Sequence, residues 1–286
     1  MWRFLIFAAV FVSTGLAQNA PSTDIFLVEL GSPPKVQNLT ARPEYDNQPH
    51  FLAGYKAFLY TSQRSGQSDI YRFDLQRRRS SRLTRTPESE YSATPLPGGR
   101  RFSVIRVEED GKQRLWSFNL DGSSPELLLP DLAPVGYQAW PGANQVLTFI
   151  LGNPATLQLA ELGRGEARIL ARQIGRCLRL VPGQDAVSFV SKAETPWMIR
   201  KWNASNGSIE NVAPVLAGSE DYAWSADGQL FMGRESTLYR YSSADHEWTA
   251  VVDLSSRRVS GITRLDVSAD GRRFLVVAQS TAGSRR

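Results

Sequence analysis

The sequence contains few of the residues from which recognisable catalytic and metal sites are built. Its 286 residues include one cysteine, Cys177, and two histidines, His50 and His246. One cysteine excludes an intramolecular disulfide framework and a cysteine-ligated zinc or iron–sulfur site. Two histidines leave little material for a histidine metal centre or a serine–histidine–aspartate triad, and no Gly-Xaa-Ser-Xaa-Gly segment occurs in the chain. We therefore expect no catalytic residues, no bound metal and no cofactor.

Lysine is also scarce, because only five of the 33 basic residues are lysines and the rest are arginines. The arginines are unevenly distributed. Nine of them lie between Arg72 and Arg106, where the only acids are Asp74, Glu88 and Glu90, although the whole chain has a net charge of only +5. This pattern predicts a local basic patch for an anionic partner rather than a surface that coats nucleic acid.

The only long hydrophobic run is at the N-terminus. Arg3 precedes the apolar segment Phe4 to Val12, and small residues at Gly15 and Ala17 are suited to cleavage before Gln18. We predict a signal peptide over residues 1–17 and a mature chain of residues 18–286, with an uncleaved anchor as the alternative. The protein is then periplasmic or secreted by a bacterium, with no transmembrane segment after cleavage and no cysteine positioned for lipid attachment.

Two short elements repeat along the chain. A glycine turn after an apolar residue recurs about every 43 residues, which is the usual length of a four-stranded propeller blade. The turns occupy residues 51–54, 96–99, 140–142, 181–183, 224–228 and 267–271. After each of the first five comes a strand with period-two alternation, at residues 69–75, 114–120, 156–162, 198–202 and 237–241. The mature chain should therefore be nearly all β.

The sixth turn has no such strand after it, but a matching segment stands at the front of the chain. Residues 24–30 resemble residues 69–75, and Asn38-Leu39-Thr40 corresponds to Arg82-Leu83-Thr84. We predict that residues 24–40 provide the two outer strands of the last blade and residues 262–280 its two inner strands. This arrangement closes the ring and removes its open edges. The fold class is then a single six-bladed β-propeller of four-stranded antiparallel blades.

The repeats resemble those of TolB-type, WD40-like propellers. The resemblance is carried by Pro49 to Gly54, by the two Ser-Ala-Asp-Gly turns at 225–228 and 268–271, and by Ser68 to Leu75 leading to Arg-Leu-Thr. It covers nearly the whole mature chain and implies a periplasmic scaffold that binds other proteins. TolB also has an α/β domain ahead of its propeller, and we expect this chain to lack one.

In such a propeller, the loops from one blade to the next lie around one mouth of the central channel. Polar and aromatic side chains that converge there form a candidate site for a ligand or partner. The residues that we predict for it are Asp46, His50, Glu90, Tyr91, Tyr137, Arg176, Asp221 and Tyr222.

The turns within each blade between strands one and two, and between strands three and four, lie on the opposite face. Blades one, two and six are neighbours in a closed ring, so their arginines should form one patch. The predicted basic face consists of Arg77, Arg78, Arg79, Arg100, Arg101, Arg272 and Arg273, joined by Lys35 and Lys56. Arginine suits carboxylate and phosphate groups, which points to an acidic protein surface or an anionic envelope component.

Two functions follow from these patterns. The first is an exported, non-catalytic and monomeric propeller that binds a protein or an envelope component. The second is a calcium-dependent hydrolase of lactones or other small molecules, with oxygens from Asp46, Asn47, Glu90 and Asp221 at the channel mouth. The acids are scattered and form no regular ligand loop, which favours the binding function.

Overall fold

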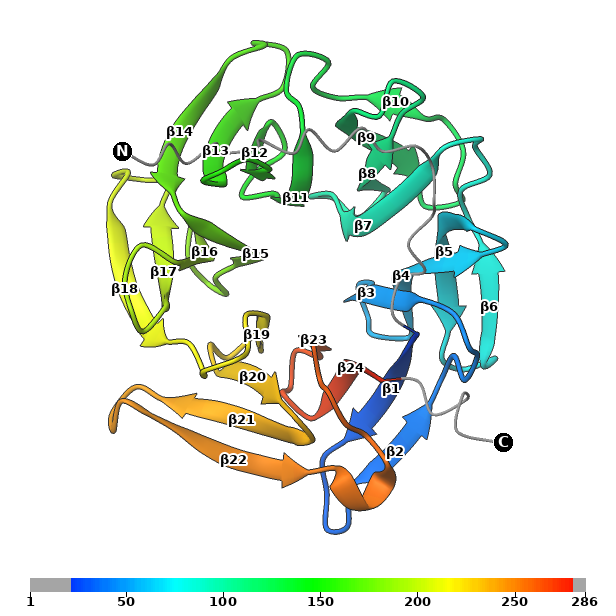
Figure 1. Cartoon of the computed structure of the whole chain (residues 1–286), viewed down its shortest axis with the longest axis vertical. Helices are drawn as coiled ribbons and strands as arrows, with labels where there is room; N and C mark the ends of the chain where they lie inside the picture. The colour runs from blue at the N-terminus through cyan, green and yellow to red at the C-terminus, as the bar shows by residue number, and fades with distance from the viewer. Residues whose placement is uncertain (1–21, 280–286) are drawn as a thin grey trace, which may run out of the picture.

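The computed structural model describes residues 22–279, which form a ring of six four-stranded antiparallel sheets (Figure 1). The predicted signal peptide lies outside the described residues. In blades 1 to 5, the strands follow one another from the channel outward. They are β3 (Asp46–Phe51), β4 (Ala57–Arg64), β5 (Gln67–Asp74) and β6 (Arg79–Arg82) in blade 1, and β7 (Ser89–Pro95), β8 (Arg101–Val107), β9 (Gln113–Asn119) and β10 (Glu126–Leu127) in blade 2.

The next three blades have the same order. Blade 3 comprises β11 (Val135–Ala139), β12 (Gln145–Ile150), β13 (Thr156–Glu161) and β14 (Ala167–Arg172). Blade 4 comprises β15 (Ile174–Leu180), β16 (Ala186–Ser191), β17 (Met198–Asn203) and β18 (Ile209–Pro214). Blade 5 comprises β19 (Tyr222–Trp224), β20 (Leu230–Arg234), β21 (Thr237–Ser242) and β22 (Glu247–Asp253).

Blade 6 joins the two ends of the described chain, as predicted. Its order from the channel is β23 (Arg264–Val267), β24 (Arg273–Gln279), β1 (Thr23–Glu29) and β2 (Lys35–Asn38). β1 pairs with β24 over seven residue pairs, from Thr23 opposite Gln279 to Glu29 opposite Arg273, and the two lie side by side in Figure 1. The pairing closes the ring, so neither β1 nor β24 is an open edge.

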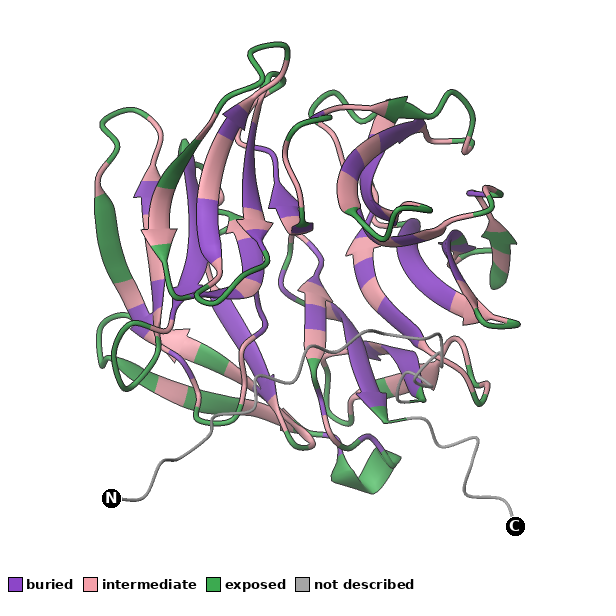
Figure 2. Cartoon of the chain, turned by 45° about the horizontal axis from the view of Figure 1, so that its top comes forward, coloured by how far each residue is buried: buried purple, intermediate pink, exposed green. Residues whose placement is uncertain are grey.

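Burial follows the position of a strand in its blade. The second strand from the channel packs on both faces against neighbouring blades, so all six residues of β16 are buried. In the outermost strands, by contrast, three of the six residues of β18 and four of the seven residues of β22 are exposed, and Figure 2 shows exposed residues gathered in outer strands and turns. Apolar clusters therefore lie between blades, and that between blades 6 and 1 includes Ile25, Phe58 and Val277. Within residues 22–279 the only helical segment is η1 (Ser255–Arg257), and no helix is long and apolar enough to cross a membrane.

The pairing of β1 with β24 should contribute strongly to stability. Ile25 of β1 is fully buried between blades 6 and 1, so Ile25→Ala should lower the free energy of unfolding by about 2–5 kcal/mol. Ile209 on the outer strand β18 is 38% exposed, and Ile209→Ala is the matched control, with an expected change within about 0.5 kcal/mol. Urea denaturation measures both. Equal losses in the two variants would contradict a stabilising role for ring closure.

Candidate functional site at the channel mouth

The innermost strands bend where they line the channel. β3, β7, β11 and β15 each show a shift of pairing register against the next strand, and the bulge of β3 lies between Asn47 and His50. A bulge redirects the side chains beside it. In β3, Gln48 has a positive φ of 54°, and its Oε1 accepts hydrogen bonds from the Ser92 backbone N–H at 2.9 Å and the Thr61 hydroxyl at 2.7 Å. Gln48 thus joins blade 1 to blade 2.

Other polar side chains link the innermost strands of different blades. Gln138 in blade 3 donates from Nε2 to the Ser92 carbonyl at 2.8 Å. Arg179 in blade 4 donates to the Leu265 carbonyl of blade 6 at 2.8 Å, and Asp266 accepts from the Phe51 backbone N–H of blade 1 at 2.8 Å. These bonds satisfy backbone groups that face the channel, where no further strand is available to pair with them.

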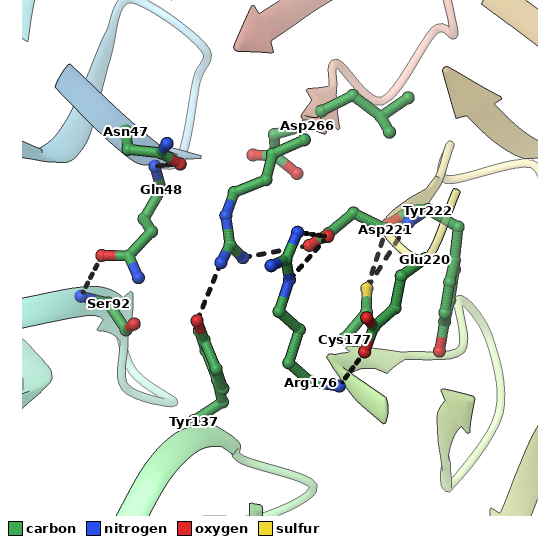
Figure 3. Close-up of polar contacts among 12 residues, drawn as sticks. Asn47, Gln48, Ser92, Tyr137, Arg176, Cys177, Glu220, Asp221, Tyr222 and Asp266 are labelled. Atoms are coloured by element: carbon green, nitrogen blue, oxygen red, sulfur yellow. Dashed lines mark hydrogen bonds and ion pairs between the residues drawn. The ribbon is translucent and has the colours of Figure 1, made fainter. Parts of the chain in front are cut away.

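Arg264 crosses the channel mouth. It belongs to blade 6, and its Nη2 donates to the Tyr137 hydroxyl of blade 3, on the opposite side of the ring, at 2.8 Å. Its Nη1 donates to Asp221 Oδ1 of blade 5 at 3.0 Å. The other oxygen of Asp221 accepts from Arg176 of blade 4, with 2.7 Å to Nη2 and 3.0 Å to Nε (Figure 3). Four blades therefore contribute to one network.

The network has two guanidinium groups and one carboxylate. Burial alone would lower the pKa of Arg264, but the Asp221 carboxylate and the Tyr137 hydroxyl raise it above its usual value, and Asp221 does the same for Arg176. Both arginines are therefore charged. The neighbouring Tyr45 is neutral, since burial raises the pKa of its phenol to about 12. Asp221 is therefore shared between two cations, and the mouth carries excess positive charge.

Two cavities lie along the channel. One, beside the network, has a volume of about 60 Å³ and is lined in part by Gln48, Tyr137 and Arg264. Toward the opposite face lies a second cavity of about 230 Å³, where Tyr55, Trp140, Trp224 and Asp266 are among the lining residues. His50 and Arg179 line both. The two cavities are therefore neighbours along the channel.

The structure brings only some of the predicted mouth residues together. Tyr137, Arg176 and Asp221 are in the network. Asp46 is fully buried at the start of β3, where Arg42 holds it through Nη2 at 2.5 Å. Glu90 is fully buried at the start of β7 beside Arg106, with 3.3 Å between Oε1 and Nε. These two acids are therefore parts of separate ion pairs.

The remaining predicted residues differ in environment. Burial lowers the pKa of the His50 imidazole, and the nearby Asp266 carboxylate only partly opposes this shift. Tyr91 is half-buried beside the mouth. Tyr222 is fully buried and packs with Cys177 in the core between blades 4 and 5, where burial raises the pKa of the thiol to about 12. Consequently Tyr222 lies away from the channel, and Cys177 is a packing residue.

The carboxylates do not form a cation site in the part of the chain that the structure describes. No group of three or more histidine, cysteine, aspartate or glutamate side chains is close enough there to hold a metal ion. Asp46, Glu90 and Asp221 are each paired with an arginine instead. A cation bound at any of them would face a guanidinium at close range, so these residues do not fit the calcium site of the hydrolase hypothesis.

The site residues predicted from the sequence do not include Arg264, Gln48, Arg179 or Asp266. One signal was available. Arg264 and Asp266 are two residues apart in a strand, so both side chains lie on one face of it, and in an innermost strand polar residues at this spacing face the channel. The contact with Tyr137 had no local signal, because 127 positions separate the two residues.

No protein-family model matches the sequence, and no curated protein matches it either. Solved structures do match. A putative TolB from Agrobacterium tumefaciens superposes with a TM-score of 0.72 at 14% sequence identity, covering 91% of this chain and 98% of that chain. TolB from Acinetobacter baumannii gives 0.59 at 12% identity, covering 91% and 64%. Oligogalacturonate lyase from Vibrio parahaemolyticus gives 0.56 at 12% identity, covering 89% and 96%.

The described residues thus form a six-bladed β-propeller whose central channel is blocked by a network of arginines, a tyrosine and an aspartate. Its fold is that of the TolB-type propellers, as the repeats predict. At these sequence identities the likeness shows the fold alone, and the same fold also occurs in a lyase. Binding and catalysis must therefore be distinguished by the residues of the site.

The excess of cations in the network predicts an asymmetry between two substitutions. Asp221→Asn leaves two guanidinium groups without their carboxylate, which should cost about 3–5 kcal/mol of the free energy of unfolding. Arg264→Gln leaves Asp221 paired with Arg176, so the expected loss is less than half as large. Urea denaturation at low salt measures both. The asymmetry is refuted if Arg264→Gln costs as much as Asp221→Asn.

Proposed function

We propose that the chain is an exported, non-catalytic β-propeller that binds a protein or an anionic component of the cell envelope. The observation that carries the proposal is an arginine sector on the face opposite the channel mouth. This arginine sector comprises Arg77, Arg78, Arg79, Arg100, Arg101, Arg272 and Arg273, from the within-blade turns of blades 1, 2 and 6. The repeated strand order supports this grouping, because in an antiparallel blade the turns between strands one and two and between strands three and four share a face.

One hydrogen bond and one shared recess support the continuity of the sector between blades 6 and 1. Arg273 of blade 6 donates from Nη1 to the Tyr55 carbonyl of blade 1 at 3.3 Å. Arg78 of blade 1 and Lys35 of blade 6 line one recess of about 310 Å³ on the outer side of the same blades. Residues almost 200 positions apart in the sequence therefore contribute to one surface.

The members of the sector differ in availability. Arg77, Arg78, Arg79, Arg100 and Arg272 are exposed, and the side chain of Arg77 is 84% exposed. Arg101 is instead held by Ser117 at 2.7 Å and by Glu126 at 3.1 Å, and Arg273 reaches Tyr55. The five exposed arginines are therefore the ones available for a partner, and the other two support the turns.

The acids of these three blades are mostly occupied within their own turns. Asp270 Oδ1 accepts from the Ser268 hydroxyl at 2.5 Å and from the Arg272 backbone N–H at 3.1 Å, which lowers the pKa of the Asp270 carboxyl. Asp74 Oδ1 accepts from the Gln76 and Arg77 backbone N–H groups, each at 2.9 Å. Of the five exposed arginines, only Arg77 lies near an acid, with 3.9 Å between its Nη1 and Asp74 Oδ2; within residues 22–279 the other four form no ion pair.

The other half of the same face is acidic. The corresponding turns of blades 3, 4 and 5 contain Glu161, Glu166, Asp185, Asp227, Asp245 and Glu247. Their basic residues are engaged, since Arg164 pairs with Glu161 at 2.9 Å and Lys201 with Glu210 at 3.3 Å. A face divided into a basic and an acidic half orients a charged partner. Exposed arginines in a cluster suit carboxylates and phosphates.

Export and the absence of catalysis rest on other features. The charged start, apolar run and small residues of segment 1–17 are typical of a signal peptide. The carboxylates at the channel mouth are ion-paired with arginines, which leaves them poorly suited to act as bases or metal ligands. Exposed aromatic residues for stacking on bases are few, and this favours a partner other than nucleic acid.

A chelator experiment separates the binding function from the metal-dependent hydrolase. A stoichiometric bound cation would raise the melting temperature, because it stabilises only the folded state. We expect the same melting temperature before and after treatment with EDTA, and no stoichiometric metal in the untreated protein by mass spectrometry. A melting temperature that falls with EDTA and recovers with added calcium would favour the hydrolase.

Neutralising the exposed part of the arginine sector should weaken binding of the partner. In the variant, Arg77, Arg78, Arg79, Arg100 and Arg272 are replaced by Gln. Cross-linking in a cell-envelope extract should capture a partner with the wild-type chain and much less of it with this variant. The salt dependence of binding to the captured partner should also become flatter, since fewer ion pairs form.

The control variant carries the same change of charge at five exposed arginines outside the sector. In it, Gln replaces Arg85, Arg168, Arg172, Arg257 and Arg258. The control should capture the partner as well as the wild type, and both variants should melt within a few degrees of it. If both variants capture the partner equally, the arginine sector is not the interface.

A further inference from the structure

A further recess, separate from the two channel cavities, opens beside the channel mouth between blades 4 and 5. It has a volume of about 460 Å³, within the range of sites for small molecules. Its walls are the β16–β17 turn with Pro196 and Trp197, the β18–β19 loop with Val215 and Leu216, and Ile262 from the loop before β23. We call it the Trp197 groove. Trp197 is 39% exposed, which is unusual for so large an apolar side chain.

Arg176 forms the charged end of the Trp197 groove. It lines both this groove and the cavity at the channel mouth. Its Nε and Nη2 both donate to Asp221, whereas its Nη1 donates to none of the residues 22–279. Its side chain is 36% exposed, compared with 12% for Arg264, the other guanidinium that shares Asp221. Arg176 is therefore the member of the network that both lines the groove and keeps an unused donor.

The acid that also lines the groove does not cancel this charge. Glu220 Oε1 accepts the Arg176 backbone N–H at 2.5 Å (Figure 3). Glu220 Oε2 accepts from Lys192 Nζ at 3.1 Å. Lys192 also lies over the Trp197 ring, 4.3 Å from its centre. Three cations, Arg176, Arg264 and Lys192, thus surround two carboxylates. Deeper in the channel Arg179 is matched by Asp266 at 3.8 Å, so the excess remains at the groove.

We propose that the Trp197 groove binds a small molecule with an apolar body and a single carboxylate. The apolar body lies against Trp197, Val215, Leu216 and Ile262, and the carboxylate accepts a hydrogen bond from Nη1 of Arg176. A single negative charge matches the single positive charge that the surrounding groups leave uncompensated. The site is on the channel-mouth face, opposite the arginine sector, so the proposal is independent of the partner proposed there.

Isothermal titration calorimetry tests the proposal with 4-phenylbutyrate as the probe. Two related compounds separate the two requirements: 4-phenylbutan-1-ol has the same apolar body without a charge, and acetate has the carboxylate without the body. The acid should bind saturably, and each of the other compounds should bind at least about tenfold more weakly. Absence of binding by the acid at millimolar concentration, or equal binding of the alcohol, would overturn the proposal.

Three variants assign the binding to the groove. Arg176→Gln removes the charge, and Ala217→Trp adds bulk at an exposed lining position without changing the network, so both should weaken binding of the acid at least about tenfold. Arg200→Gln is the matched control. Arg200 lies on β17, forms an ion pair with Glu194 and does not line the groove. It should bind like the wild type. Thermal melting confirms that each variant is folded.

Ala217→Trp keeps the test decisive if Arg176→Gln fails to fold. If Ala217→Trp is folded and binds the acid as tightly as the wild type, the ligand does not occupy the Trp197 groove and the proposal is wrong. If Arg176→Gln is folded and still binds the acid more tightly than the alcohol by the same factor as the wild type, Arg176 does not hold the carboxylate. That result also overturns the proposal.

Discussion

The pairing of β1 with β24 is the constraint on which the rest of the molecule depends. It places a segment from the start of the chain between β24 and β2, so the first and last blades become neighbours and no inner edge is left open. Once the ring is closed, β23 stands opposite β11, and Arg264 can reach Tyr137 across the channel. The same closure brings the β23–β24 turn beside the turns of blade 1, where Arg273 bonds to Tyr55. Both candidate surfaces therefore exist only in the closed ring.

Inside the ring, packing and hydrogen bonding hold different parts of the blades. The second and third strands of each blade pack between neighbouring blades and supply most of the buried apolar surface. Four of the six innermost strands are bulged, and all six face a channel that has no further strand. Their free backbone groups bond to side chains such as Gln48, Arg179 and Asp266. Polar residues in these strands are thus partly structural, and only those with exposed donors, such as Arg176, remain available to a ligand.

The fold could be predicted from the sequence because its signals are local and repeated. Glycine turns and alternating strands recur once per blade, and residues 24–40 match the pattern missing after the last turn, so closure followed from counting. The site was predicted only in part, because loop position alone does not say where a side chain points. Asp221 and Tyr222 are adjacent in sequence, yet one faces the channel and the other the core between blades, as alternation along a strand requires. Arg264 was missed because its partners come from two distant blades.

The charge at the channel mouth is in keeping with the proposed binding function, although a lyase shares the fold. A catalytic or metal-binding carboxylate needs a free oxygen facing the substrate, whereas Asp46, Glu90 and Asp221 face guanidinium groups. Converting this channel into a cation site would require removal of several arginines that also stabilise it. The positive charge that Asp221 leaves uncompensated is instead presented at Arg176, beside an apolar groove. In the proposed ligand site, charge left over from a structural network is thus what would select an anion at one edge of the mouth.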